Sequence, residues 1–163
     1  MATGRDALHI RPVANAWARI AAVVLVGLGV VAVDEARGDD LEKMAGTWRV
    51  TSLDLNGQRN DSDDVRKVTV INEPNGNWTL LVDGNEIAKG TSSIDSATDP
   101  KQVNLTITQS NDGNNVGRTY EGIYELGEKT RRVCLALDGG ERPTQFFSAA
   151  ASGHALVTYE KVE

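Results

Sequence analysis

Few residues of this chain have both the type and the spacing that enzyme chemistry requires. There are two histidines, His9 and His154, and one cysteine, Cys134. One cysteine cannot form an intramolecular disulfide, and the count also excludes a zinc site of cysteines and histidines. His154 has no second histidine or cysteine near it in the sequence, so no catalytic triad is indicated. We therefore expect a protein that is not an enzyme and that has no cofactor and no metal.

For an aspartate cluster and for the single cysteine, both a functional and a purely structural interpretation are possible. Asp61, Asp63 and Asp64 are close together but lack the glycine and the distal glutamate of an EF-hand, so a solvated loop is preferred to a calcium site. Cys134 alternates with the apolar residues around it and is expected to be a small buried side chain. A reactive thiol is the alternative, because two arginines precede it and positive surroundings activate thiols.

Composition indicates one ordinary globular domain plus an appendage. The chain has 163 residues, of which 40% are hydrophobic and 25% charged, so it has enough apolar side chains for a core. The net charge is −6. An acidic chain lacks the clustered lysines and arginines that bind phosphates, so nucleic acid is not an expected partner.

The N-terminal segment differs from the rest of the chain. Three arginines precede an uninterrupted apolar run at residues 20–33. As a helix this run would span about 21 Å, short of the bilayer core of about 30 Å. Basic residues, a short apolar run and small residues after it are typical of a secretory signal peptide. We expect a signal peptide at 1–38, cleaved before Asp39, and a periplasmic or extracellular domain at 39–163. The alternative is an uncleaved anchor, and this segment is the only expected membrane contact.

After residue 45 the pattern is of short strands with tight turns between them. Asn-Gly and Asp-Gly pairs between apolar runs predict hairpins. The apolar side chains change parity between Val50 and Leu53, which predicts a bulge near Thr51-Ser52. A short helix at 61–67 is as compatible with the sequence as a solvated loop. Eight strands are expected, at about 47–55, 68–71, 78–82, 86–94, 103–108, 120–126, 132–137 and 154–161.

This spacing predicts an all-β fold. Helices of 10–15 residues do not separate the strands, and successive hairpins favour an up-and-down order over a Greek key. The expected fold is therefore an eight-stranded antiparallel up-and-down barrel. A barrel of this size is either filled by side chains or holds one small ligand.

Four motifs, in order, resemble one known family. They are Gly-Thr-Trp-Arg-Val-Thr-Ser-Leu (46–53), Gly-Ile-Tyr-Glu-Leu (122–126), Arg-Val-Cys-Leu-Ala (132–136) and Arg-Pro-Thr-Gln-Phe (142–146). The first contains the G-x-W signature of lipocalins and other calycins. The ordered set covers essentially 41–162 and is similar to the small secreted lipocalin-like domain abundant in planctomycetes. The resemblance implies an exported, lipocalin-like eight-stranded barrel whose biochemical role is uncharacterised.

The resemblance also implies a plug at one end of the barrel. In lipocalins the matching tryptophan closes that end, often under a basic side chain from a late strand. Gly46 and Trp48 would form the plug here, with Arg142 or Lys161 in cation–π contact. A ligand would enter at the opposite end.

Strand parity selects a candidate ligand-binding set. Its members lie on the more apolar side of their strands: Trp78, Leu80, Val103, Leu105, Tyr120 and Tyr124. If they line a cavity, the protein binds a small apolar or amphipathic ligand. If they fill the interior, the protein is a structural or protein-interaction domain with no small-molecule ligand and an unknown protein partner. An apolar cavity of about 300 Å³ or more would favour the first hypothesis.

Overall fold

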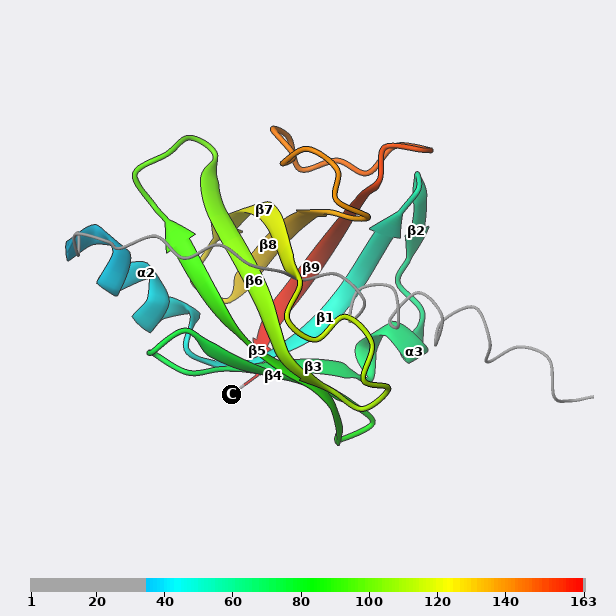
Figure 1. Ribbon diagram of the computed structural model, residues 1–163, viewed down its shortest axis with the longest axis horizontal. Helices are drawn as coiled ribbons and strands as arrows, with labels where there is room; N and C mark the ends of the chain where they lie inside the picture. Colours follow the sequence, from blue (N-terminus) through cyan, green and yellow to red (C-terminus); the bar gives the residue numbers. More distant parts are fainter. Residues whose placement is uncertain (1–34, 163) are drawn as a thin grey trace, which may run out of the picture.

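The computed structural model describes residues 35–162, and its strands form a closed antiparallel barrel (Figure 1). The order in the sheet is β2-β1-β3-β4-β5-β6-β7-β8-β9, and β1 also pairs with β9. The strands are β1 (Gly46–Leu55), β2 (Gln58–Asn60), β3 (Val68–Asn72), β4 (Asn77–Val82), β5 (Asn85–Asp95), β6 (Lys101–Ser110), β7 (Thr119–Leu126), β8 (Thr130–Ala136) and β9 (His154–Val162).

This topology confirms the predicted fold class. Eight strands close the barrel in sequential order, and β2 is an additional outer strand. The sequence analysis missed β2, which pairs with the last residues of β1 across the Asn56-Gly57 turn. Strand β2 has only three residues, and their side chains are exposed or half-exposed. Such a segment shows no alternation of apolar and polar residues from which a strand could be predicted.

The structure also contains the bulge and a tight turn that the sequence predicts. The register between β1 and β9 shifts between Val50 and Ser52, which confirms the predicted bulge. Asp83 and Gly84 connect β4 to β5 with φ angles of 51° and 77°. Two successive left-handed residues make the tight hairpin turn that Asp-Gly pairs favour.

Two helices lie on opposite sides of the barrel in Figure 1. Helix α2 (Glu35–Met44) precedes β1, and its Met44 is buried in the core. The Asp40 carboxylate fastens this helix, because it accepts hydrogen bonds from Tyr124 Oη (2.7 Å) and Lys101 Nζ (2.6 Å). Helix α3 (Asp63–Arg66) confirms the short-helix interpretation of that loop and buries Val65 completely.

The expected signal peptide falls almost wholly outside the described residues, and so does the apolar run at 20–33. Helix α2 has ten residues and begins at Glu35. The expected cleavage before Asp39 would therefore fall inside α2. Within residues 35–162, no helix is long and apolar enough to cross a membrane.

A second, smaller apolar cluster lies on the outside of the barrel. Ile123, Cys134 and Leu156 pack together there with Phe146. Phe146 belongs to the segment 137–153, which contains no strand and crosses beside β7, β8 and β9 in Figure 1. Cys134 is fully buried, as expected, and burial raises the pKa of its thiol above the usual value. These are the surroundings of an inert cysteine.

Candidate ligand-binding site

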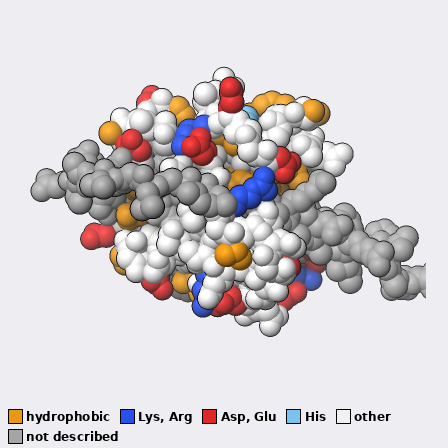
Figure 2. Space-filling view, viewed as in Figure 1, with side chains coloured by type: hydrophobic (Ala, Val, Ile, Leu, Met, Phe, Trp, Pro, Cys, Tyr) orange, Lys and Arg blue, Asp and Glu red, His pale blue; other side chains and the backbone are white. Residues whose placement is uncertain are grey.

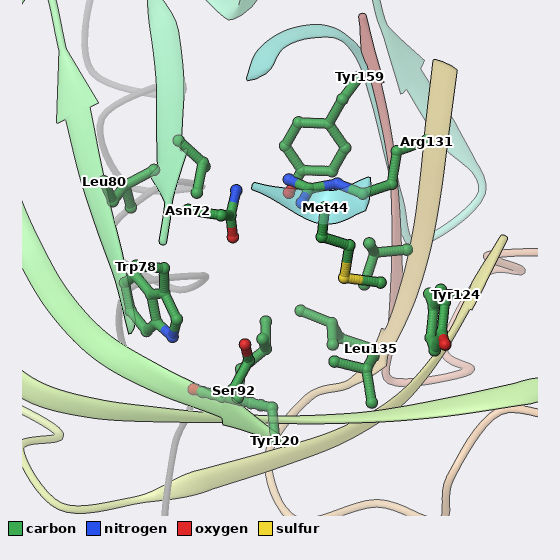
Figure 3. Close-up of a pocket in the computed structure, with 14 residues that line it drawn as sticks. Met44, Asn72, Trp78, Leu80, Ser92, Tyr120, Tyr124, Arg131, Leu135 and Tyr159 are labelled. Atoms are coloured by element: carbon green, nitrogen blue, oxygen red, sulfur yellow. The ribbon is translucent and has the colours of Figure 1, made fainter. Parts of the chain in front are cut away.

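All six predicted ligand-binding residues line one interior cavity, with a volume of about 70 Å³. They come from β4, β6 and β7 and point inward because side chains alternate along a strand. Figure 3 shows Trp78, Leu80, Tyr120 and Tyr124 around the cavity. The sequence analysis missed the other lining residues, which are Met44, Val70, Asn72, Ser92, Arg131, Val133, Leu135 and Tyr159.

Trp78 owes its place in the wall to a glycine on the next strand. Trp78 on β4 pairs with Gly90 on β5. A Cβ atom at Gly90 would lie 2.3 Å from Cζ2 of the indole and 1.8 Å from the carbonyl oxygen of Thr106. Both distances are far below van der Waals contact, so only glycine allows the indole to pack against β5.

The cavity lies in the half of the barrel next to α2. Its wall includes Met44 of α2 and Asn72, the last residue of β3. The opposite half contains Val65, Val68 and Ile107, all with no exposed surface. The sequence analysis expected a ligand to enter at the end opposite Trp48, but α3 packs into the core there.

Trp48 lies in the barrel end beside α2, and its surroundings match the expected plug. The side chain is fully buried and its Nε1 donates a hydrogen bond to the carbonyl oxygen of Met44 (2.7 Å). Two cations lie over the indole ring: Arg131 Cζ is 4.8 Å and Lys161 Nζ 5.4 Å from its centroid. Gly46 leaves room for Lys161, since a Cβ there would be 3.2 Å from Lys161 Cε.

The prediction that Arg142 covers Trp48 is wrong. Its guanidinium donates hydrogen bonds to the carbonyl oxygens of Val103 (3.1 Å) and Gly122 (2.6 Å) and to Asn104 Oδ1 (2.8 Å). Arg142 belongs to the segment 137–153 rather than to a strand, so it lies on the outer surface of the barrel. The Arg-Pro-Thr-Gln-Phe motif therefore fastens that segment to β6 and β7.

Arg131 is the functional candidate that the sequence analysis overlooked. Its side chain lines the cavity and the residue is only 5% exposed. Besides Trp48, the ring of Tyr159 lies 4.4 Å from its Cζ. Burial lowers the pKa of the guanidinium, while the charge and hydroxyl of Tyr159 act in the opposite direction. Arg131 has the same parity on β8 as Val133 and Leu135. The sequence therefore did contain a signal for this residue, namely a charged side chain on the apolar face of a strand.

Four polar side-chain atoms of the lining residues are buried and have no hydrogen-bond partner in the structure. They are Asn72 Nδ2, Trp78 Nε1, Tyr120 Oη and Arg131 Nε. No aspartate or glutamate belongs to the cavity lining. Tyr124 is different, because its hydroxyl donates to Asp40; burial and this carboxylate raise the tyrosine pKa.

The remaining reactive residues lie apart from the cavity. His154 begins β9, and its Nε2 is 3.3 Å from the carbonyl oxygen of Glu141. In the acidic loop, Asp61 lies near Arg59 (3.8 Å) and Asp64 pairs with Lys67 (2.7 Å). In the described part of the chain, no three His, Cys, Asp or Glu side chains come together as a metal site.

No family model, curated protein or solved structure matches this chain. The likeness to calycins therefore rests on the ordered motifs and on the closed barrel of eight strands.

Proposed function

We propose that this protein is an exported lipocalin-like barrel that binds a small apolar or amphipathic molecule in its interior. The cavity carries the proposal, because side chains from seven strands and α2 converge on one apolar space. Burial of apolar surface there favours an apolar ligand group over water. Export is proposed from the arginines and the short apolar run at 20–33.

The size of the cavity limits the ligand. Its volume of about 70 Å³ is well below the ~300 Å³ of a site for a drug-sized molecule. A short aliphatic chain or a single ring is therefore the proposed size class. Met44 projects into the cavity in Figure 3, and a flexible methionine is the lining side chain that a longer chain would displace most easily.

The indole N–H groups provide a direct test by nuclear magnetic resonance. A series of n-alkanols, from butanol to octanol, is titrated into ¹⁵N-labelled protein. The Trp78 indole signal is expected to shift saturably, because Trp78 lines the cavity and its Nε1 has no hydrogen-bond partner. The Trp48 signal should shift less, because its N–H is hydrogen-bonded to Met44.

A matched pair of variants on β6 controls the experiment. Leu105→Trp fills the cavity and should abolish the shift of Trp78. Gln109→Trp adds the same side chain at an exposed position and should leave the ligand-induced shift of the Trp78 signal unchanged. If no alkanol shifts Trp78 in the unmodified protein, or if both variants respond alike, the interior does not bind ligand.

One observation favours a second function, that of a solid-core interaction domain. The cavity is smaller than the size that the sequence analysis required of a binder, and Phe147 in the segment 137–153 is 63% exposed. On the face shown in Figure 2, acidic and basic side chains are interspersed and hydrophobic ones form small separate groups. That face offers an interaction partner no broad apolar or single-sign patch.

A further inference from the structure

A second hollow, larger than the interior cavity, lies on the outer surface of the barrel. Its volume is about 470 Å³. Outward side chains of β5, β6 and β7 form its floor, and the chain that leaves β8 for the segment 137–153 forms one side. We call it the outer groove. Its main polar lining residues are Ser93, Asn104, Thr106, Arg118, Thr119 and Glu121.

The strand register gathers the polar side chains of the floor into two rows. Asn104 of β6 lies between Ser93 of β5 and Glu121 of β7, and Thr106 of β6 pairs with Thr119 of β7. Directly opposed side chains on neighbouring strands have Cβ atoms about 5 Å apart. A single small molecule can therefore contact several of these side chains at once.

Arg142 fixes the orientation of the central amide in this floor. Its guanidinium donates a hydrogen bond to Asn104 Oδ1 (2.8 Å) and lies 3.5 Å from Glu121 Oε1. Because a guanidinium can only donate, the oxygen of the Asn104 amide is assigned and the Nδ2 group is left as a donor. Within residues 35–162, this Nδ2 group makes no hydrogen bond.

The composition of the outer groove excludes strongly apolar and strongly charged ligands. Ala136 and the buried Tyr120 are its only apolar side chains, so an apolar ligand would gain little from binding there. Its two charged residues, Arg118 and Glu121, have opposite signs, so the lining has no net charge that would select an anion or a cation. The remaining groups are hydroxyls and an amide, which both donate and accept hydrogen bonds.

We propose that the outer groove binds a small neutral saccharide. Sugar hydroxyls also donate and accept, so they complement the Thr106 hydroxyl, the Asn104 amide and the Glu121 carboxylate. The volume lies in the range of sites for small molecules. At the rim nothing lies within 4 Å of the position of a Cβ at Gly139, which leaves room for a sugar ring to approach the backbone. This site is additional to the interior cavity.

Threonine methyl signals locate the binding directly by nuclear magnetic resonance. The full chain with labelled threonine methyls is titrated separately with glucose, N-acetylglucosamine and maltose to about 50 mM, which saturates a site with a dissociation constant of about 1 mM. At least one saccharide is expected to shift the signals of Thr106 and Thr119 saturably. The signal of Thr108, which is exposed on β6 outside the outer groove, should stay unchanged.

A matched pair of variants on β6 assigns the effect to the outer groove. Thr106→Val removes one hydroxyl at nearly constant volume and should weaken saccharide binding by about fivefold, measured at the Thr119 methyl. Thr108→Val makes the same change outside the groove and should keep the affinity of the unmodified protein. An unchanged pattern of the other threonine signals shows that each variant is folded.

Three sugars that share one ring test the charge argument: glucose, glucuronate and glucosamine. Neither charged sugar should bind more tightly than glucose, because Arg118 and Glu121 oppose each other. Binding of glucuronate about tenfold tighter than glucose would overturn the neutral-ligand proposal and indicate an anion site at Arg118.

Two other results would also overturn the proposal. One is the absence of saturable shifts at Thr106 and Thr119 with all three saccharides of the titration. The other is an equal loss of affinity in Thr106→Val and Thr108→Val, which would place the binding elsewhere. Neither result depends on the alkanol titration followed at Trp78, so the outer groove and the interior cavity succeed or fail separately.

Discussion

Replacement of Trp48 by alanine should be the most damaging single change in the barrel. The side chain is fully buried, and truncation of such an aromatic costs about 3–5 kcal/mol. The variant also leaves the carbonyl of Met44 without its donor and removes a ring from Arg131. Because of these additional losses, we expect the free energy of unfolding to fall by about 5 kcal/mol, the upper end of that range. This loss is comparable with the whole stability of a small domain.

Urea denaturation followed by circular dichroism measures this loss without relying on tryptophan fluorescence. Trp48→Phe keeps an aromatic ring but removes the donor to Met44, so it should lose about 2 kcal/mol. Phe147→Ala truncates an exposed aromatic and should stay within about 0.5 kcal/mol of the unmodified protein. A midpoint for Trp48→Ala close to that of Phe147→Ala would refute the account of the plug.

Three further experiments, two substitutions and one labelling reaction, test other contacts. Gly90→Ala should destabilise the fold by about 3 kcal/mol in urea, because the new Cβ collides with Trp78 and a backbone carbonyl; Gly140→Ala, whose Cβ would meet only a carbonyl at 3.3 Å, should change little. Asp40→Asn should lose about 2 kcal/mol at neutral pH. Burial raises the Asp40 pKa, but the hydrogen bonds from Lys101 and Tyr124 outweigh it and the net shift is downward. Its stabilisation is thus present above the unfolded pKa of about 3.9 and is lost as the pH falls further. The difference between Asp40→Asn and the unmodified protein should therefore shrink in urea titrations below about pH 4, and a constant difference would contradict this linkage. Cys134 should react with a thiol reagent only after unfolding, since it is buried and its pKa is raised; rapid labelling of the native protein would show that it is accessible.

Side-chain alternation explains why the barrel and most of its inner face were predictable. Val103 and Leu105 on β6 alternate with polar residues, so their inward direction follows from the period of a strand. The same rule placed Trp78 on β4 and Tyr124 on β7 correctly in the cavity wall. Local turn chemistry then fixed the sequential order of the hairpins.

What the sequence could not predict depends on contacts between distant segments. Arg142 carries no periodic signal, and only the folded segment 137–153 brings it to the carbonyls of β6 and β7 rather than to Trp48. Arg131 had the inward parity, but a charge is normally assigned to solvent. Its burial depends on contacts with Trp48 and Tyr159, which are far apart in the sequence and meet only in the folded barrel.

The central claim is that ligand binds inside the barrel, and intermolecular nuclear Overhauser effects test it most directly. Protein with labelled methyl groups is saturated with 1-hexanol, and contacts from the hexanol chain are recorded. We predict cross-peaks to the methyl groups of Leu80 and Leu105, which line the cavity, and none to Ile71, which is 40% exposed. Cross-peaks confined to Ile71 and other surface residues, or their complete absence, would contradict the account.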